Sequence, residues 1–408
     1  MKVAIIGQGY VGLTISAFAA SKYDVVGFDN SPRIVEQLNK GISHIEGVDS
    51  AVIAKWASEG RYRATANGAD IKGADIVVIA VPTPLTKDRK PDMSFIEAAC
   101  KTIAENIDKP VLIINESTSF PGTVRNFIQP LIEKLSANKF GHMYAISPER
   151  VDPGRGDYNQ KNTPRLYAGL TPEASLATRE FYSSFCDELI EVSSPEVAEA
   201  AKLFENTFRQ VNIALVNEFA QIAHKLGISV HETLEAADTK PYGFMKFNPS
   251  AGVGGHCIPV DPTYLAHVAE QLGAPSTFIE RANEVNLEMP LYIVDRVQAD
   301  NGGTLKGKKV VVVGVAYKPN VADVRETPAE IVIDELRKRG ADVSWHDDVV
   351  GSWRGESSAA LAGDIAIVVT LHASVDVAKV LASAPYVFDT TGRVVTEKTQ
   401  LRGKAHGL

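Results

Sequence analysis

The residues Gly7-Gln8-Gly9-Tyr10-Val11-Gly12 form the motif that most clearly indicates a fold class. It follows the β-branched run Val3–Ile6 and opens a stretch of helical character that extends through Ala20. Glycines at this spacing, between a strand and a helix, let the backbone approach a pyrophosphate that faces the N-terminus of the helix. Asp29 ends the next predicted strand, where an acid can bind the hydroxyls of a ribose. The pattern predicts a domain that binds a dinucleotide.

The acid after the second strand also bears on which dinucleotide binds. Asp29 would repel a 2′-phosphate, which favours NAD over NADP, although the cation Arg33 lies nearby in the sequence.

Val81-Pro82-Thr83-Pro84 follows the next strand, at the edge of the sheet where ligands bind, and is either a cofactor contact or only a rigid loop. Glu116-Ser117-Thr118 follows the strand after that, and Thr118 is either part of the site or a helix cap.

Strands and helices alternate twice along the 408 residues, from Val3 and again from near Lys309. Between the two alternations, Pro195–Leu226 has no internal glycine or proline and predicts one long helix, which also offers a face to a second subunit. We expect an α/β protein with two Rossmann-like, doubly wound parallel-sheet domains, joined by a long central helix and a helical dimerisation region, with boundaries at 1–192, 193–300 and 301–408. The other predicted strands are Val25–Asp29, Ile76–Val81, Val111–Ile114 and Tyr144–Ile146 in the first domain and Val310–Val313, Asp342–Trp345, Ile365–Thr370 and Val387–Asp389 in the last.

The composition argues against several classes of protein. A formal net charge of -8 is unlike the basic surface that binds nucleic acid or anionic membranes. No apolar run reaches the ~18–20 residues that cross a bilayer, and Met1 runs directly into the first strand, with no room for a signal peptide. We expect a cytoplasmic homodimer or higher homo-oligomer, with neither nucleic acid nor a membrane as partner.

A second informative stretch runs from Gly252 to Pro262 and reads Gly-Val-Gly-Gly-His-Cys-Ile-Pro-Val-Asp-Pro. Its glycines allow another molecule close to the backbone, and its cysteine, Cys257, gains thiolate character if a cation or a helix N-terminus is near. A proline-rich turn then leads into a predicted helix near Thr263–Gln271. Cys257 is a candidate nucleophile, whereas Cys100 and Cys186 fit the buried, inert state of most free cysteines. The three cysteines are too widely spaced for a disulfide framework or a zinc site, so no metal is expected.

Three further polar residues are candidates for chemistry. Lys202 and Asn206 stand four residues apart on the predicted long helix, so both side chains leave one face. Such a pair is most often solvated surface, but Lys and Asn side by side can also stabilise an alkoxide or an oxyanion. Glu149, in the motif Ser147–Gly154, ends a strand and is available as a base, although an acid on a loop is by default only solvated.

With these motifs the sequence strongly resembles the UDP-glucose/GDP-mannose dehydrogenase family, over nearly the whole chain. Within that family it resembles the branch that acts on UDP-N-acetylhexosamines. The resemblance implies an N-terminal NAD domain, a central helical dimerisation region and a C-terminal domain that completes the site for a UDP-sugar. The motifs that carry it are Gly7–Gly12, Val81–Pro84, Ser147–Gly154, Lys202 with Asn206, Gly254–Cys257, Gly314–Pro319 and Asp323–Glu326.

The resemblance implies that NAD oxidises the C6 alcohol of the sugar to a carboxylate by removing four electrons, with Cys257 as the nucleophile that forms a thiohemiacetal and then a thioester. The other implied catalytic residues are Lys202 and Asn206 as an oxyanion-stabilising pair, Asp261 as a carboxylate that works with the lysine and a water, Glu149 as an acid that assists thioester formation and hydrolysis, and Thr118 beside it. The candidate binding residues are, for the cofactor, Gly7, Gly9, Tyr10, Val11, Gly12, Asp29, Arg33, Pro82, Thr83, Thr118 and Arg325, and, for the substrate, Glu149, Arg150, Val151, Lys202, Asn206, Phe247, Gly252, Gly254 and Lys318.

The resemblance also bears on the sugar. His256 before the cysteine, Val260 in the place of a lysine of the glucose enzymes, and Lys240-Pro241-Tyr242-Gly243-Phe244-Met245 resemble enzymes that act on UDP-N-acetylglucosamine. We expect that substrate, with UDP-N-acetylmannosamine and UDP-glucose as alternatives, because a small difference in a pocket is worth only ~1–3 kcal/mol. Ser250-Ala251 and Leu371-His372-Ala373-Ser374 depart from the family's Gly-Pro and Asp/Asn-His-Ser, so these two loops can bind differently.

Two other classes of function stay open on the sequence. A two-electron β-hydroxyacid dehydrogenase can share the fingerprint and a helical Lys-x-x-x-Asn, but it needs no thiol and releases one NADH per substrate. A non-catalytic nucleotide-sugar sensor would bind without turnover, and the set Lys202, Asn206, Cys257 and Asp261 argues against it.

Overall fold

The computed structural model describes residues 1–45, 47–151, 157–394 and 405–408. They form two compact units. The first contains Met1–Glu205 and Thr263–Gly273, and the second contains Asn206–Pro262 and Ala274–Leu408. The last part of the predicted motif Ser147–Gly154, from Asp152 on, lies outside the described residues.

The first unit is built on an eight-stranded sheet with the strand order β3-β2-β1-β4-β5-β6-β7-β8. All neighbouring strands are parallel except β6 and β7. The chain order reverses between β1 and β4, which is where open α/β sheets bind ligands. This confirms the predicted doubly wound domain, although β3, β7 and β8 were missed. The strands are β1 (Lys2–Ile6), β2 (Asp24–Phe28), β3 (Tyr62–Thr65), β4 (Ile76–Ile79), β5 (Leu112–Asn115), β6 (Met143–Ile146), β7 (Arg165–Gly169) and β8 (Leu189–Glu191).

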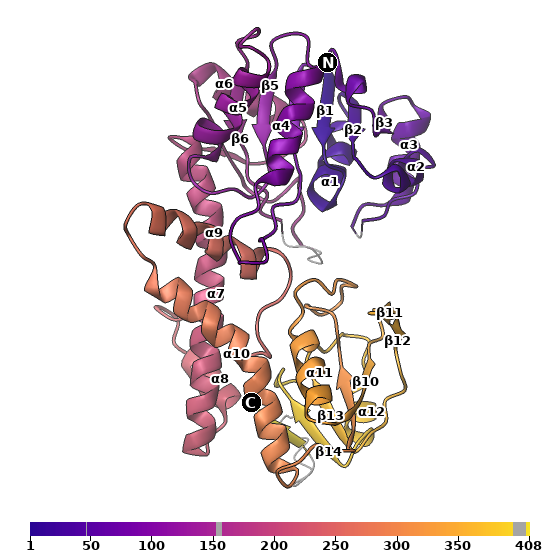
Figure 1. Ribbon diagram of the computed structural model, residues 1–408, viewed down its shortest axis with the longest axis vertical. Helices are drawn as coiled ribbons and strands as arrows, with labels where there is room; N and C mark the ends of the chain where they lie inside the picture. The colour runs from indigo at the N-terminus through magenta and orange to yellow at the C-terminus, as the bar shows by residue number, and fades with distance from the viewer. Residues whose placement is uncertain (46, 152–156, 395–404) are drawn as a thin grey trace. The chain divides into compact units, whose positions relative to one another are not determined.

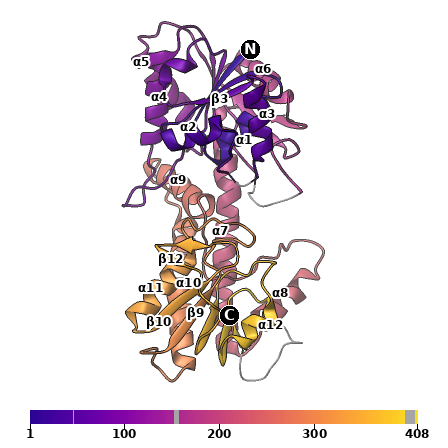
Figure 2. The ribbon, with the colours of Figure 1, turned by 90° about the vertical axis from the view of Figure 1, so that its right-hand side faces the viewer.

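Helices cover both faces of this sheet (Figure 2). Side chains alternate along a strand, so Val3 and Ile5 of β1 share a core with α1, α3 and α6, while Ala4 and Ile6 share a core with α4 and α5 on the other face. The helices of this unit are α1 (Tyr10–Ala19), α2 (Pro32–Asn39), α3 (Ser50–Ser58), the 3₁₀ turn η1 (Gly68–Ile71), α4 (Ser94–Asn106), the π-helical turn η2 (Val124–Ile128), α5 (Gln129–Leu135) and α6 (Pro172–Ser183).

The second unit contains a five-stranded, all-parallel sheet with the order β10-β9-β13-β14-β15. One face packs against α7, α8, α10 and α11, and the other against α12. The strands are β9 (Lys309–Val313), β10 (Asp342–His346), β13 (Ile365–Val368), β14 (Tyr386–Asp389) and β15 (Ala405–Gly407), with a separate hairpin of β11 (Ser352–Trp353) and β12 (Glu356–Ser357). The helices are α8 (Val230–Asp238), α10 (Thr277–Asp300), α11 (Pro328–Lys338) and α12 (Val377–Ala382).

The long central helix is α7 (Pro195–Leu226), which contributes residues to both units (Figure 1). It starts and ends at the predicted residues because Pro195 suits the first turn of a helix and Gly227, with φ +71°, ends it. Among the helices formed by the described residues, none combines the length and apolar character needed to cross a membrane.

Helix α9 (Cys257–Gln271) begins at Cys257, and the prediction that it begins near Thr263 was wrong. The proline-rich segment forms the first turns of the helix instead of a preceding turn. Pro259 falls in the first turn, where backbone N–H groups have no helical partner to lose, and Pro262 is accommodated inside the helix. Cys257 is therefore the first residue of a helix, at the end that carries positive partial charge.

The two sheets repeat one local arrangement. Gly7 follows β1 with φ +94°, and its N–H donates to the carbonyl that ends β2 at 2.8 Å. Gly314 follows β9 with φ +82°, and its N–H donates to the carbonyl that ends β10 at 2.8 Å. Asp29 and Asp347 come next after those carbonyls, and each accepts the N–H that follows the glycine, at 2.9 and 2.8 Å. The turn that follows the first strand therefore has the same hydrogen bonds in both sheets.

Candidate active site

The loop between β1 and α1 has the geometry of a phosphate-binding turn. A Cβ on Gly7 would lie 2.4 Å from the carbonyl oxygen of Ala80, and a Cβ on Gly12 would lie 1.9 Å from the carbonyl oxygen of Gly7. These two glycines are needed for the loop to pack. A Cβ on Gly9, by contrast, would meet no protein atom within 4 Å. The space beside Gly9, at the N-terminus of α1, can therefore accept a ligand.

The side chain of Gln8 is fully buried beneath this loop. Its Oε1 accepts hydrogen bonds from the hydroxyls of Tyr62 at 2.9 Å and Ser16 at 3.1 Å. Its Nε2 donates to the carbonyls of Ile5 at 3.2 Å and Gly7 at 3.0 Å. All the hydrogen-bonding capacity of the amide is used, so Gln8 holds the glycine loop from below. The sequence analysis did not predict this role.

Asp29 follows β2 directly and is half-buried. One carboxylate oxygen accepts the N–H of Gln8 at 2.9 Å and the other accepts the N–H of Ser31 at 2.9 Å. Each oxygen keeps a further lone pair for a ribose hydroxyl. Arg33 is exposed in the first turn of α2, and Tyr10–Val11 are half-buried at the start of α1.

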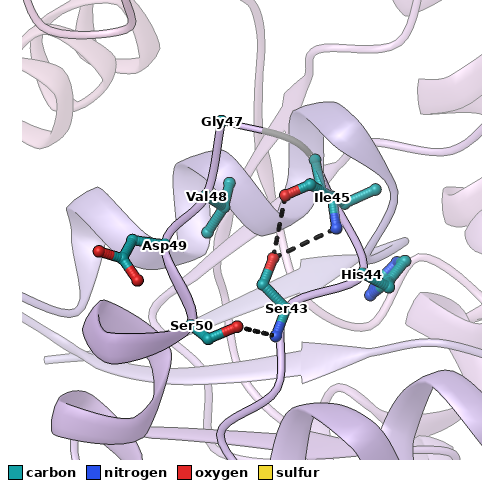
Figure 3. Close-up of a pocket in the computed structure, with 7 residues that line it drawn as sticks. All are labelled: Ser43, His44, Ile45, Gly47, Val48, Asp49 and Ser50. Atoms are coloured by element: carbon teal, nitrogen blue, oxygen red, sulfur yellow. Dashed lines mark hydrogen bonds between the residues drawn. The ribbon is translucent and has the colours of Figure 1, made fainter. Parts of the chain in front are cut away.

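A hollow of about 620 Å³ lies in the segment between α2 and α3 (Figure 3). Ser50 Oγ accepts the N–H of Ser43 at 2.9 Å and closes this segment. His44 lies within electrostatic range of Asp29 and Arg33; burial lowers the pKa of its imidazole, and the Asp29 carboxylate partly opposes that shift. The cofactor end thus includes an imidazole that the sequence did not indicate. The hollow is lined by Ser43, His44, Ile45, Gly47, Val48, Asp49 and Ser50.

The loops after β4 and β5 meet at the carboxyl edge of the sheet. The N–H of Val81 donates to Ser117 Oγ at 2.9 Å. In the first of these loops Pro82 is exposed and Thr83 is buried. The structure thus brings these two candidates to the edge beside Gly7, whose Cβ position faces the end of β4.

Glu199 of α7 binds the segment that follows Thr118. Its buried carboxylate accepts the N–H of Gly122 at 2.6 Å and of Val124 at 3.1 Å. Burial raises the pKa of Glu199 to about 7, although these donors oppose the shift. Thr118 is half-buried and does not cap the helical segment that follows, because the residue at that N-cap is Thr123.

Glu149 is not the solvated loop acid of the default interpretation. Only 8% of it is exposed, and its carboxylate accepts hydrogen bonds from the N–H of Val151 and the side chain of Gln160. The guanidinium of Arg165 lies 3.6 Å from Glu149 and 3.0 Å from Glu116. Burial raises the pKa of Glu116, and the charge of Arg165 opposes that shift. Glu149 is therefore held in a buried ionic network. To act as a base, its carboxylate has to accept a proton while it is bound to these partners.

Two further candidates of the first unit lie on or against α7. Lys202 is buried, with 8% exposed, which is uncommon for lysine because its charge is costly to remove from water. Arg150 forms an ion pair with Glu205 of α7 at 2.7 Å and donates to the carbonyl of Pro164 at 2.8 Å. The segment that carries Glu149 is thus tied to α7.

The three cysteines differ as expected. Cys257, in the second unit, is exposed, whereas Cys100 and Cys186 of the first unit are buried. Burial raises the pKa of Cys100 to about 12 and that of Cys186 to about 11. Since the thiolate is the nucleophile, only Cys257 is suited to react.

Asn206 and Asp261 are in contact within the second unit. The side-chain amide of Asn206 donates to Asp261 Oδ2 at 2.6 Å, and Asp261 is fully buried. Cys257 and Asp261 are four residues apart on α9, so they lie on one face of that helix. The second unit therefore brings together an amide, a carboxylate and a thiol that the sequence had singled out.

The glycines before Cys257 pack on the loop after β9. A Cβ on Gly254 or on Gly255 would lie 2.7 Å from side-chain atoms of Tyr317. The N–H of Gly255 donates to the carbonyl of Arg325 at 2.9 Å. Only glycine permits this close approach, which fixes the loop that leads into Cys257.

Arg325 places a positive charge near the thiol. Its Nε donates to the carboxylate of Asp323 at 2.9 Å. This hydrogen bond raises the pKa of Arg325, and the charge of Cys257 contributes to the shift, so guanidinium and thiol lie within electrostatic range. A nearby cation favours the thiolate. Lys318, in the same loop as Tyr317, is half-buried.

The two remaining substrate candidates also lie in the second unit. Phe247 packs edge-on against Phe208, with ring centroids 5.9 Å apart. Gly252 has φ +129°, and a Cβ there would lie 2.8 Å from the carbonyl oxygen of Asn286. Packing alone therefore requires a glycine at position 252, whether or not this residue also binds substrate.

Family models match most of the chain. The NAD-binding domain of the UDP-glucose/GDP-mannose dehydrogenase family matches residues 1–186, the central domain matches 196–288 and the UDP-binding domain matches 311–396. The chain belongs to the UDP-glucose/GDP-mannose dehydrogenase family. It is an NAD-dependent nucleotide-sugar dehydrogenase.

Two curated relatives and a solved structure show how similar this dehydrogenase is to known enzymes. It is 35% identical over 378 residues to a UDP-N-acetyl-D-mannosamine dehydrogenase of Pyrococcus horikoshii, a match that covers 90% of this chain and 88% of that one. It is 35% identical over 363 residues to a UDP-N-acetyl-D-glucosamine 6-dehydrogenase of Pseudomonas aeruginosa, with 86% and 83% covered. A solved structure of a UDP-N-acetylmannosamine dehydrogenase from Pyrococcus horikoshii superposes with a TM-score of 0.90 at 32% identity, and the match covers 100% of this chain and 99% of that one.

The sequence analysis missed the buried polar groups that hold the loops of this dehydrogenase. For one of them a signal was available, because Asp347 follows its strand as Asp29 does. For the others the partners lie far away in the sequence, as with Glu199 and Gly122. The missed groups are Gln8, Glu116, Arg165, Glu199, Asp347 and His372.

Proposed function

We propose that this dehydrogenase oxidises the C6 alcohol of a UDP-N-acetylhexosamine, in the first place UDP-N-acetylglucosamine, to the uronic acid through a thioester on Cys257. The observation that carries the proposal is the 2.6 Å hydrogen bond between Asn206 and Asp261, one helical turn along α9 from the exposed Cys257. A carboxylate and an amide next to a reactive thiol suit a reaction in which an oxyanion forms beside sulfur.

The residues of the first unit fit NAD. Gly9 leaves space for a pyrophosphate at the start of α1, and Asp29 offers lone pairs to a ribose. When bound, the nicotinamide supplies an acceptor for hydride, which the four-electron reaction uses twice.

The protein residues have the following roles in the proposed reaction. Loss of the hydroxyl proton and of a hydride from C6 gives an aldehyde, with Lys202 and Asn206 stabilising the developing alkoxide. The Cys257 thiolate adds to the aldehyde carbon and forms a C–S bond. Loss of a second hydride gives the thioester, which a water hydrolyses: a C–O bond forms, the C–S bond breaks and the thiolate leaves. Asp261 and Glu149 accept and return the protons of the water.

Counting NADH tests this proposal. Wild-type enzyme should release two NADH for each UDP-N-acetylglucosamine, and Cys257→Ala should form no acid. Cys257→Ser should stall at hydrolysis, as the ester formed by the second oxidation, because an alkoxide leaves an ester less readily than a thiolate leaves a thioester. Cys100→Ala, in the buried core of α4, serves as the matched control and should keep both oxidations. One NADH for each sugar, or unchanged acid formation by Cys257→Ala, would refute the covalent step.

UDP-N-acetylmannosamine is the second candidate substrate, and the relatives favour it. Those from Pyrococcus horikoshii, Yersinia pestis and Escherichia coli are named UDP-N-acetyl-D-mannosamine dehydrogenases. The epimers differ only at C2, so the choice is measured as a ratio of kcat/KM across UDP-glucose, UDP-N-acetylglucosamine, UDP-N-acetylmannosamine, UDP-N-acetylgalactosamine and GDP-mannose. A higher kcat/KM for the mannosamine epimer would replace the first candidate by the second.

We also expect a homodimer that uses α7. Large apolar side chains are exposed along this helix at helical spacing, which suits burial against a second copy. Sedimentation of the wild type and of Leu215→Glu tests this, with the dimer expected only for the wild type. A wild-type monomer at micromolar concentration would remove the expectation. The exposed side chains are Phe204, Phe208, Leu215, Ile222 and Leu226.

A further inference from the structure

The second unit buries a carboxylate and an imidazole behind the loop that follows β9. Asp347 comes after β10 and His372 comes after β13, and they are 3% and 1% exposed. His372 Nε2 lies 3.0 Å from Asp347 Oδ1. Burying two such groups costs free energy unless hydrogen bonds satisfy them. Neither residue belongs to the candidate catalytic set, so the pair calls for an explanation of its own.

The carboxylate of Asp347 accepts hydrogen bonds from the backbone of two segments. One oxygen accepts the N–H groups of Val315–Ala316 and the other those of Val349–Val350, at 2.8 to 3.2 Å. Burial alone would raise the pKa of Asp347, but the hydrogen bonds from His372 and from these N–H groups together hold it well below its usual range. Asp347 is therefore ionised and saturated. Unlike the half-buried Asp29, it has no capacity left for a ribose.

The hydrogen bonds of His372 specify its tautomer. Its Nδ1 accepts the N–H of Asn320 at 2.8 Å, so Nδ1 carries no proton. Its Nε2 faces the Asp347 carboxylate and must carry the proton. The structure thus requires a neutral imidazole with the proton on Nε2, because a proton on Nδ1 would point at the N–H of Asn320.

This imidazole fixes one end of the loop that carries Lys318. Asn320 has φ +65°, and its side-chain oxygen accepts the N–H of Ala373 at 2.7 Å, so it is bonded on two sides to the segment of His372. At the other end of the loop, Thr370 Oγ1 donates to the carbonyl of Ala316 at 2.7 Å. The loop is clamped at both ends by residues that follow β13.

The same loop supports the glycines before Cys257. Tyr317 fills the space beside Gly254 and Gly255, and its N–H donates to the carbonyl of Asp323 at 2.9 Å. His372 is bonded to Asn320, which lies three residues after Tyr317 in the same loop, and Tyr317 packs on the glycines that precede Cys257. All of these residues lie within one compact unit.

We propose that His372 is a positioning residue for the reactive thiol: as the neutral Nε2–H tautomer it holds Asn320, and through the Tyr317 loop it fixes the segment that leads into Cys257. Its importance for turnover rests on the proposed role of Cys257 as nucleophile.

Among the residues that the structure describes, few charged groups surround His372. Asp347 faces Nε2, and Asp348, bonded to His346 at 3.1 Å, accepts a hydrogen bond from Ser374 at 3.4 Å. Arg393 donates to the carbonyl of Leu371 at 2.9 Å. Asp347 is thus a charged group in direct contact with the imidazole.

Two substitutions separate the bonds of His372. In His372→Asn the amide oxygen takes the place of Nδ1, so the bond from Asn320 is kept and the bond to Asp347 is lost. In His372→Gln the amide nitrogen takes the place of Nε2, so the bond to Asp347 is kept and the bond from Asn320 is lost. Both variants should melt below the wild type, because each removes one buried polar contact of His372. If His372 only stabilised the fold, the alkylation rate and the KM for the UDP-sugar would change by the same factor in both variants.

Alkylation by iodoacetamide reads the position of Cys257 without turnover, because the other cysteines are buried. His372→Gln should alkylate at least about threefold more slowly, since the thiol drifts from Arg325 and loses thiolate character. His372→Asn should stay within about twofold of the wild type.

Kinetics provide the second readout. The KM for the UDP-sugar should rise about fivefold in His372→Gln and little in His372→Asn, with the KM for NAD unchanged in both, as expected for one lost hydrogen bond. Equal changes in the two variants, or none, would overturn the proposal. A further outcome distinguishes this proposal from the proposed function. If His372→Gln is alkylated more slowly than His372→Asn but Cys257→Ala still forms acid, the positioning role is supported and the thioester mechanism is refuted.

Discussion

Replacing Gly9 by alanine should abolish tight NAD binding while leaving the fold intact. A Cβ on Gly9 meets no protein atom within 4 Å, and φ at Gly9 is -72°, which alanine adopts freely. The folded state should therefore change in stability by less than about 1 kcal/mol, because the loss of a glycine N-cap and the reduced entropy of the unfolded chain nearly offset each other. The methyl group would occupy the space where a pyrophosphate approaches α1.

The size of the effect on binding follows from the contacts that are lost. One or two hydrogen bonds from backbone N–H groups to a charged phosphate are worth about 1.5–3 kcal/mol each, so the KM for NAD should rise at least about 10- to 150-fold. Steady-state kinetics with NAD varied, together with thermal melting, measure both quantities.

Gly12→Ala is the matched control for this experiment. Its Cβ would lie 1.9 Å from the carbonyl oxygen of Gly7, so this variant should lose stability as well as NAD binding. An unchanged KM for NAD in a well-folded Gly9→Ala enzyme would refute the assignment of the pyrophosphate site. Equal destabilisation of both variants would show that the space beside Gly9 is filled by protein.

Three further outcomes are expected. Asn206→Leu removes an amide donor from the buried Asp261, so kcat should fall about 10- to 100-fold with the KM for NAD unchanged, and a wild-type kcat would contradict this. Burial raises the pKa of Glu199 to about 7 from 4.5, so its ionisation costs stability as the pH rises between these values. Melting of the wild type should show that loss, up to about 3 kcal/mol, and Glu199→Gln should lack it; identical pH profiles would rule this out. Native enzyme should react with a thiol reagent at one cysteine, and unfolded enzyme at three, and rapid native labelling of Cys100 or Cys186 would be inconsistent with their burial and raised pKa.

Local patterns in the sequence predicted most of the fold. The strand, glycine loop and acid from Val3 to Asp29 form in the predicted order, because each element depends on residues close to it in the chain. The long helix has its predicted ends for the same reason. The start of α9 was wrong, since proline was taken as a turn although its missing N–H costs nothing in the first turn of a helix. The short strand β3 was missed because it carries charged Arg63 among its four residues.

The site was predicted only in part, because several of its supports are formed by residues distant in sequence. Asn206 and Asp261 are paired across 55 positions, and this contact was not predicted, although the family resemblance singled out both residues. No residue near Glu149 in the chain indicates that its carboxylate is buried and lies next to the guanidinium of Arg165. The clamp of Asn320 by His372 spans 52 positions. Such hydrogen bonds leave no periodic pattern in the sequence.

Intact mass analysis of enzyme quenched in acid during turnover can detect the thioester on Cys257 itself. With NAD and UDP-N-acetylglucosamine present, a fraction of the chains should carry one sugar-acyl group, located on the peptide of Cys257 and released by hydroxylamine. Two results together would contradict the thioester mechanism. Wild-type enzyme would produce NADH continuously with no adduct on Cys257, and the Cys257→Ala variant would still form the acid.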